Sequence, residues 1–375
     1  MKVSNCYYII PTHAIGGAEK RFIELSCFLH RHEKRFHFHL IISKQLHAAI
    51  LENNEMAALL ADGPQVISYD LDENVPVKRF QQNLYEFVCR YAGPDDILHY
   101  ILLFPGLCFP LKHKKTVFSL TESSLENVNF NGKAMYLLNA LRARIVDVLD
   151  PAVHNKIRKY LFFKQKRILL TPGSFADTNT FMPAAAGKKA NHFVFLGRFF
   201  FVKQVVELLQ TLPDVCSKLN DAGINNYKFI FIGYGQLEEK MKNILSQPGF
   251  NALPVEMIKT GRPQDILSKS KVFFSVQLRN NYPSKSLLEA MSAGNIPLVT
   301  DVGDTRRIAA PEFSYYVPEN FTAADISNSL LKILSLDEKV LQQKMQASRK
   351  FVIDNFSIAA SAKYYAGIYD QLGRK

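Results

Sequence analysis

A single carboxylate, Glu289, lies among apolar residues in a stretch whose pattern is typical of a ligand-binding turn. Residues 272–276 form an apolar run that predicts a buried strand. After a polar turn, residues 284–293 have the pattern of a helix that ends at Gly294, and 296–300 form a second apolar strand. The stretch therefore predicts a strand–loop–helix–strand unit of a parallel sheet.

The predicted helix begins beyond the carboxyl ends of the strands, where open α/β sheets bind their ligands. Its free N–H groups and its dipole favour a phosphate near Ser284. Glu289 follows one turn later, and a carboxylate in apolar surroundings needs a partner, for which a pair of ligand hydroxyls is one candidate. The residues thus suit a ligand that carries both phosphate and hydroxyl groups.

The same stretch resembles the signature of retaining glycosyltransferases of the GT-B fold, in their large family 4. That signature has two glutamates with seven residues between them, in a setting of the form E-x-F-P-x-x-L-L-E-A-M-A-x-G-x-P-V-V. Glu289 takes the second position, and Asn281 stands at the first, where this chain departs from the family. The other matching residues are Tyr282, Pro283, Leu287, Leu288, Ala290, Met291, Gly294 and Pro297.

Two cations follow the strand predicted at 192–196. An arginine and a lysine at a strand end can clamp a diphosphate, the arginine as a fork and the lysine as a point charge. Arg198 and Lys203 fall on the two cations of the family pattern G-R-L-x-x-x-K-G, while Gln204 replaces its final glycine. The resemblance therefore implies that Arg198, Lys203 and Glu289 are the catalytic residues.

Glycine-rich turns occur at two other predicted strand ends. Gly16 and Gly17 open a helix after the strand at 6–10, which allows either close approach to an anion or a tight turn alone. The family has a similar G-G-A-E-R stretch whose loop approaches the donor diphosphate. Gly233 and Gly235 follow a strand predicted at 228–232, and the usual role of such a G-x-G string is a turn from strand to helix. The implied donor-binding set is Gly16, Gly17, Gly197, Gly233, Gly235, Arg262, Asn281, Ser284, Lys285 and Ser286.

Two residues are candidates for the acceptor side. His99 ends a predicted strand in a D-D-I-L-H sequence that resembles the family's D-V-V-H, but a buried core histidine is an equal alternative. Glu122 follows Thr121 where relatives commonly carry His-Asp, and it is a weak substitute for that pair.

The resemblance covers nearly the whole chain and implies an α/β fold, GT-B, with two Rossmann-like doubly wound domains facing a central cleft. Residues 1–182 are expected to form the acceptor domain, and 183–357 the nucleotide-sugar-binding domain. Residues 358–375 would form a helix that returns to the first domain.

The chain has 375 residues and a net charge of +12, and the excess of cations is spread over both halves. Such charge favours anionic substrates or an anionic membrane surface, although plain solubility is an equal alternative. No nucleic-acid-binding motif, membrane-spanning run, signal-peptide pattern or cysteine pair is evident, which favours a cytoplasmic protein. Residues 154–167 carry six cations around apolar residues, which predicts a basic amphipathic helix that lies either on a solvated face or on a membrane.

The resemblance implies transfer of a sugar from a UDP- or GDP-sugar to a saccharide or lipid-linked saccharide, in bacterial surface-polysaccharide or lipopolysaccharide synthesis. It implies no active-site metal, and the D-x-D string at 70–72 is interpreted as a chance match. Two alternatives stay open: a GT-B-fold nucleotide-sugar epimerase, and a non-catalytic relative that binds nucleotide sugars.

Overall fold

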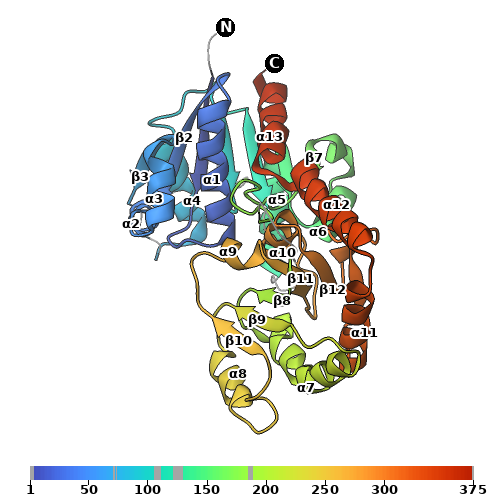
Figure 1. Cartoon of the computed structure of the whole chain (residues 1–375). Helices are drawn as coiled ribbons and strands as arrows, with labels where there is room; N and C mark the ends of the chain where they lie inside the picture. Colours follow the sequence, from blue (N-terminus) through green and yellow to red (C-terminus); the bar gives the residue numbers. More distant parts are fainter. Residues whose placement is uncertain are drawn as a thin grey trace. The chain divides into compact units, whose positions relative to one another are not determined.

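The computed structural model describes residues 4–70, 72, 74–104, 111–120, 130–184 and 189–373, and it divides the chain into two compact units (Figure 1). Unit 1 comprises Met1–Gly173 and Ile358–Lys375, and unit 2 comprises Ser174–Ser357. The division falls before the boundary expected at residue 182, and the chain returns to unit 1 at Ile358.

Unit 1 is a parallel sheet of seven strands in the order β3-β2-β1-β4-β5-β6-β7. Its strands are β1 (Ser4–Ile10), β2 (Phe36–Ser43), β3 (Gln65–Tyr69), β4 (Ile97–Ile101), β5 (Thr116–Leu120), β6 (Ile145–Val148) and β7 (Ile168–Leu170). Its helices are α1 (Gly17–His32), α2 (Lys44–Leu51), α3 (Asn54–Ala61), α4 (Val77–Val88), α5 (Phe130–Arg142), α6 (Pro151–Tyr160), the 3₁₀ helix η1 (Phe162–Arg167) and α13 (Ile358–Gly373).

Unit 2 is a parallel sheet of six strands in the order β10-β9-β8-β11-β12-β13. Its strands are β8 (Ala190–Leu196), β9 (Lys228–Ile232), β10 (Val255–Ile258), β11 (Ser270–Ser275), β12 (Ile296–Thr300) and β13 (Tyr315–Val317). Its helices are α7 (Val205–Asp221), α8 (Glu238–Leu245), α9 (Gln264–Leu267), α10 (Lys285–Ser292), α11 (Ala323–Leu334), α12 (Glu338–Phe356) and the 3₁₀ helices η2 (Phe201–Lys203) and η3 (Thr305–Arg307). Both sheets reverse their strand order once, next to their first strand, so the predicted doubly wound α/β architecture is confirmed for each unit.

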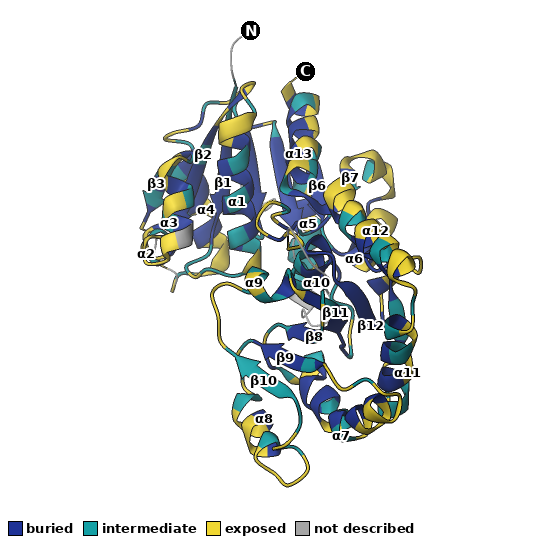
Figure 2. Ribbon diagram, in the orientation of Figure 1, coloured by how far each residue is buried: buried dark blue, intermediate teal, exposed yellow. Residues whose placement is uncertain are grey.

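The central strands are buried because helices cover both faces of each sheet, whereas the edge strand β10 is half-buried (Figure 2). In unit 2, alternate strand residues such as Phe229 and Ile230 belong to two apolar clusters on opposite faces. Helices α7, α8 and α11 pack on one face, and α10 packs on the other. The period-2 alternation of the strands thus gives each face its own apolar layer.

Unit 1 has a buried polar network where α13 packs near α1 and the sheet. His99 bonds to the hydroxyls of Tyr369 (2.8 Å) and Ser119 (2.7 Å), and Ser119 donates to Asp147 Oδ2 (2.9 Å). The α13 network, as we call it, consists of Tyr8, Arg21, His99, Ser119, Asp147, Thr171, Tyr364, Tyr365 and Tyr369. It joins the return helix to four strands of the sheet through side chains far apart in the sequence.

The predicted amphipathic helix at 154–167 is wrong as a single element. The α-helix α6 ends at Tyr160, and η1 follows as a separate 3₁₀ turn. Leu161 adopts a non-helical conformation between them, with φ −109° and ψ 50°. The cations and aromatic residues of this segment therefore lie on two differently oriented turns instead of on one helical face.

Candidate active site at the switch point of unit 2

The reversal of strand order in unit 2 occurs between β8 and β11, and the predicted catalytic cations follow β8 directly. The loop after β8 is held against the loop after β9 by backbone hydrogen bonds from Gly197 N–H to Ile232 (3.0 Å) and from Phe199 N–H to Tyr234 (2.8 Å). These bonds fix Arg198, between the two donors, at the carboxyl edge of the sheet. This edge is where doubly wound sheets bind ligands.

Gly233 and Gly235 are required by this close approach of two loops. Gly233 has a φ of +152°, and a Cβ there would lie 1.9 Å from the carbonyl oxygen of Gly197. Gly235 has a φ of +153°, and a Cβ there would lie 2.7 Å from the carbonyl oxygen of Phe199. The glycines therefore shape the turn itself, which is the local role that a G-x-G string commonly has.

Arg198 is exposed and has no hydrogen-bond or ion-pair partner among the residues that the structure describes. It borders a cavity of about 540 Å³ at the ends of β8, β9 and β10. The cavity is lined by Leu196, Gly197, Arg198, Ile232, Gly233, Tyr234, Lys259, Thr260 and Gly261. A guanidinium with no protein partner at the rim of a largely apolar cavity is free to pair with an anionic ligand.

Lys203 is half-buried, and it links the loop after β8 to the loop after β11. Its Nζ donates to Gln277 Oε1 (3.1 Å), and Leu278 N–H donates to the Val202 carbonyl (3.0 Å). The Gln277 backbone is held in turn by Thr300 Oγ1 (2.9 Å). Burial lowers the pKa of Lys203 to about 8, and a nearby anion would raise this pKa by favouring the charged ammonium.

The loop after β11 is fixed by Asn280, a residue that no sequence pattern singled out. Its Oδ1 accepts from Tyr282 N–H (3.1 Å) and Asp304 N–H (3.2 Å), and its Nδ2 donates to Asp304 Oδ2 (3.2 Å). The loop after β12 approaches so closely that a Cβ on Gly303 would lie 2.5 Å from Asn280 Cβ. The asparagine–glycine pairing across two loops is a tertiary contact, so only the turn-forming character of N-N and D-V-G-D could have suggested it.

The N-terminus of α10 follows this loop and has Ser284 as its N-cap, with Lys285 and Ser286 in the first turn. No side-chain hydrogen bond caps this terminus among the described residues. Asn281 is half-buried and has no hydrogen-bond partner within the same described part, and Glu289 is half-buried on the second turn of the helix. An uncapped helix N-terminus at the carboxyl edge of a sheet is suited to a phosphate group.

Arg262 lies at the end of the turn after β10, outside the lining of the cavity. It is exposed and forms an ion pair with Asp265, with Nε 2.9 Å from Oδ2. If Arg262 is to contact a nucleotide-sugar donor as predicted, its guanidinium must first leave the carboxylate of Asp265.

Gly16 and Gly17 belong to unit 1, where they start α1 after the loop that follows β1. The Gly16 N–H donates to Glu19 Oε2 (3.0 Å), and a Cβ on Gly16 would lie 2.6 Å from that oxygen. A Cβ on Gly17 would meet nothing within 4 Å. The carboxylate of Glu19 thus accepts a hydrogen bond from one N–H group of this turn, whereas the space beside Gly17 is open.

The sequence left two alternatives for His99, an acceptor-side residue and a buried core histidine, and the structure has the second. His99 is fully buried, both ring nitrogens have hydrogen-bond partners, and burial lowers its pKa to about 3. The assignment of His99 to the acceptor side is therefore corrected: it holds α13 on the sheet. Glu122 and Thr121 lie outside the described residues.

Within the described ranges, no group of three or more histidine, cysteine, aspartate or glutamate side chains is arranged to hold a metal ion. No helix in the same part of the chain is long and apolar enough to cross a membrane.

The architecture of the whole chain matches several solved structures. A glycosyltransferase from Rickettsia africae ESF-5 has a TM-score of 0.76 at 14% identity, with both chains covered completely. Sucrose-phosphate synthase from Thermosynechococcus elongatus has a TM-score of 0.70 at 15% identity, over 98% of this chain and 99% of that one. The Anabaena protein Alr3699/HepE, in complex with UDP-glucose, has a TM-score of 0.69 at 11% identity, over 98% and 99%. No curated protein sequence matches the chain significantly.

Residues 177–350 match the family model described as glycosyl transferases group 1, and this segment is almost the whole of unit 2. The matched segment contains the switch point, the two cations after β8 and the helix that carries Glu289. The family match over unit 2 and the GT-B fold of the two units together support a glycosyltransferase as the activity of this chain.

Proposed function

We propose that the chain is a retaining glycosyltransferase that transfers a sugar from a nucleotide-sugar donor to a saccharide or lipid-linked saccharide acceptor. The observation that carries the proposal is Arg198, an exposed guanidinium without a protein partner in the described structure, at the switch point of unit 2. Lys203 follows on the same loop, and the uncapped α10 begins after the neighbouring strand β11. These groups are suited to the diphosphate of a nucleotide sugar.

In the proposed reaction, the bond between the sugar and the diphosphate breaks and negative charge grows on the leaving phosphate. Arg198 and Lys203 stabilise that growing charge, which is electrostatic catalysis by preorganised groups. The family resemblance implies that the acceptor hydroxyl attacks from the face that the diphosphate leaves, so that the anomeric configuration is retained. The hydroxyl oxygen bonds to the anomeric carbon as the bond to the diphosphate breaks, and its proton passes to the departing phosphate oxygen. The cations perform the charge stabilisation that a metal ion performs in other transferases, and the reaction as proposed needs no metal.

Glu289 is proposed to hold the ribose hydroxyls of the donor through charge-assisted hydrogen bonds. Its position on the second turn of α10 supports this role, because the first turn is then left for the phosphate. The nucleotide is proposed to be UDP or GDP. The UDP-glucose complex of the Anabaena neighbour supports the first of these.

The proposed setting is synthesis of a bacterial surface polysaccharide or lipopolysaccharide on the cytoplasmic side. The lack of a spanning helix in the described structure is compatible with that setting. Asn281, in place of the family's glutamate, favours one alternative, a relative that binds donors without transferring sugar.

A panel of UDP- and GDP-sugars, with the free nucleoside diphosphates as controls, would test the proposal by thermal stabilisation of the protein. A donor at a hundred times its dissociation constant adds about 2.7 kcal/mol to the free energy of unfolding. The stabilising donor is then incubated with bacterial glycolipid and saccharide extracts, and the anomeric configuration of the product is read by NMR.

Transfer with retained configuration is the expected result. Transfer with inversion would contradict the retaining mechanism. Donor turnover without an acceptor would indicate an epimerase or hydrolase, and donor binding without any turnover would indicate the non-catalytic relative.

A further inference from the structure

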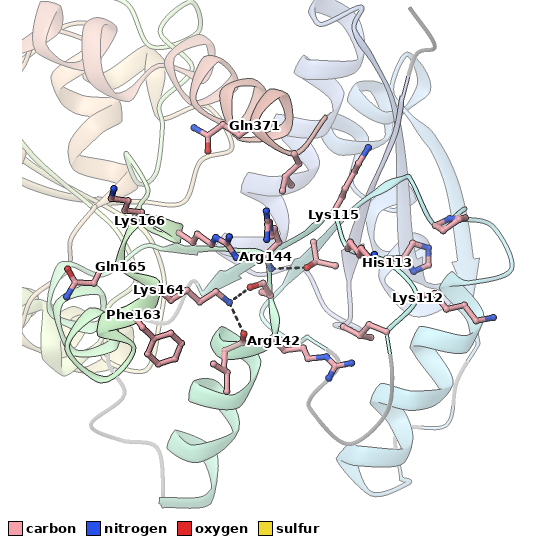
Figure 3. Close-up of a pocket in the computed structure, with 18 of the residues that line it drawn as sticks. Lys112, His113, Lys115, Arg142, Arg144, Phe163, Lys164, Gln165, Lys166 and Gln371 are labelled. Carbon is pink, nitrogen blue, oxygen red and sulfur yellow. Dashed lines mark hydrogen bonds between the residues drawn. The ribbon is translucent and has the colours of Figure 1, made fainter. Parts of the chain in front are cut away.

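A cavity of about 1180 Å³ opens at the amino ends of β5, β6 and β7 in unit 1 (Figure 3). Its wall is formed mainly by three connections: residues 111–116 before β5, residues 141–144 before β6, and residues 162–167 before β7. Doubly wound sheets bind their substrates at the opposite, carboxyl edge. The proposed transfer reaction therefore assigns no role to this cavity.

The lining of this cavity is strongly cationic. Eight of its side chains are lysine or arginine, and Asp95 is the one carboxylate in the lining. The cations are Lys112, Lys114, Lys115, Arg142, Arg144, Lys164, Lys166 and Arg167. Lys112, Lys115 and Lys166 have no ion-pair partner among the described residues. Like charges gathered around one hollow repel each other, and an anionic ligand removes that repulsion.

The ammonium group of Lys164 is used within the fold. Its Nζ donates to the carbonyls of Ala140 and Leu141 (2.8 Å each) and to that of Ala143, at the C-terminal end of α5. Burial, followed by the repulsion of Arg167 and Arg144, lowers its pKa to about 8. Lys164 thus anchors η1 to the end of α5 and fixes the direction of the residues beside it.

The residues beside Lys164 are unusually apolar for an exposed turn. The side chains of Phe162 and Phe163 are 70% and 66% exposed, and Tyr160, just before them, is 65% exposed. The two phenylalanine rings contact each other edge to face, with centroids 5.7 Å apart. Both phenylalanines also line the cavity, so their rings and the cations form one continuous surface.

We propose that this surface docks unit 1 on an anionic phospholipid bilayer. Lipid phosphates would enter the cationic cavity, while Phe162, Phe163 and Tyr160 would bury their rings among the headgroups and upper acyl chains. A free phosphate would account for the cations but not for three exposed aromatic rings. A single nucleic-acid strand stacks its bases on rings spaced along a groove, whereas these two phenylalanines pack edge to face against each other within one turn.

Co-sedimentation of the whole chain with lipid vesicles tests the proposal. Vesicles of phosphatidylcholine mixed with phosphatidylglycerol are expected to bind the protein, and binding should weaken as salt is added. Vesicles of phosphatidylcholine alone should bind it at least tenfold more weakly. The charge-reversed variant Lys112→Glu/Lys166→Glu and the ring-deleted variant Phe162→Ser/Phe163→Ser should each lose at least tenfold in affinity for the anionic vesicles.

The matched control is Lys34→Glu/Lys78→Glu, which makes the same change in net charge at two exposed lysines of unit 1 outside the cavity. It should retain most of the vesicle binding. Unchanged thermal midpoints of all three variants would show that the fold is intact.

Equal losses in the control and charge-reversed variants would overturn the proposal, because they would show attraction by net charge alone. Two further arms use glycerol phosphate and a single-stranded RNA oligonucleotide as soluble probes. Binding of either probe that depends on Lys112 and Lys166 but not on the phenylalanines, without binding to vesicles, would identify a site for a soluble anion and would also overturn the proposal.

Discussion

The two units are built on related strand orders, yet their polar side chains lie in different places. In unit 2 both faces of the sheet are covered by apolar clusters, and polar groups such as Lys203, Gln277 and Asn280 gather at the carboxyl edge. In unit 1 the α13 network brings polar side chains into the interior, and Asp147 within it is almost completely buried. These polar groups of unit 2 lie at the edge of its sheet, whereas the α13 network of unit 1 attaches a helix from within.

This difference separates residues that bind a ligand from residues that stabilise the fold. An edge side chain that binds a ligand can change without loss of the fold, because water or ligand replaces its contacts. A buried carboxylate cannot change in that way, because its hydrogen-bond partners would lose their acceptor inside the protein. Substitutions at the two kinds of position should thus have opposite signatures.

The largest effect on stability is expected for Asp147→Ala. The carboxylate of Asp147 accepts from Tyr364 (2.6 Å), Tyr365 (2.6 Å) and Ser119 (2.9 Å), and its loss would leave these hydroxyls and the nearby Arg21 uncompensated. The expected loss is about 3–5 kcal/mol, and hydrogen–deuterium exchange should place it in unit 1. Asp354→Ala removes an exposed ion pair in unit 2 and should cost less than about 1 kcal/mol. Equal losses in the two variants would remove the contrast between the units.

Arg198→Ala should lower kcat by about 10²–10³-fold while the fold stays unchanged. The guanidinium is exposed and has no partner in the described structure, so its removal disturbs no protein contact. Transfer rates at saturating donor, together with the thermal midpoint, test this. Lys350→Ala removes another exposed cation of unit 2, on α12, and should leave the rate unchanged. A loss in donor affinity equal to the loss in kcat/KM would show that Arg198 only anchors the ground state.

Glu289→Ala should weaken donor binding by about 1.5–3 kcal/mol, or roughly 10- to 150-fold, because a charged hydrogen-bond acceptor for the ribose is lost. Isothermal calorimetry with the stabilising nucleotide sugar measures this. Glu256→Ala, on β10, is the matched control and should bind the donor normally. Unchanged affinity of the Glu289 variant would exclude the ribose role.

The pH dependence of kcat/KM should report Lys203 in the free enzyme. Burial lowers the pKa of Lys203 to about 8, so its charge, and with it kcat/KM, should fall as pH rises through about 8. The contribution of Lys203 to the free energy of unfolding has the opposite pH dependence. The folded protein prefers the neutral amine, so this contribution is lost as pH falls through about 8. Lys203→Arg should remain charged and flatten the alkaline limb. An alkaline limb that persists unchanged in this variant would assign the titration to another group.

The smallest effect is expected for Asn281→Glu. Asparagine offers an acceptor and two donor hydrogens without charge, and we expect the site to be matched to that pattern. The variant should then transfer the native sugar several-fold more slowly, as measured by initial rates across the donor panel. A gain with every sugar would indicate instead that Asn281 marks a decayed site.

The sequence predicted more of unit 2 than of unit 1. The reason is that local patterns can be read from a sequence, whereas contacts between distant residues cannot. In unit 2 the strands predicted at 192–196, 272–276 and 296–300, the helix at 284–293 and the turns after Leu196 and Ile232 follow from local apolar patterns and glycines, and the structure has all of them. The strands β10 and β13 were not predicted. Asn280 could not be predicted, because its role depends on Gly303 in a different loop.

In unit 1 the sequence could not decide between two roles for His99. The hydroxyl that fixes its Nδ1 comes from Tyr369, 270 residues away in the chain. The break at Leu161 was missed too, because the spacing of apolar residues continues across it while the backbone does not. Lys164 explains the break, since its three carbonyl contacts hold the following turn on the end of α5.

The return of α13 to unit 1 also sets an order of events during synthesis. Unit 2 is one continuous segment, so it can fold as soon as it has left the ribosome. Unit 1 receives its first 173 residues earlier, but His99 and Asp147 have no tyrosine hydroxyls from α13 until the whole of unit 2 has been made. The nascent first unit must therefore wait in an incomplete form, without these hydrogen-bond partners for His99 and Asp147. We expect this interval to be the stage at which the chain most needs a chaperone.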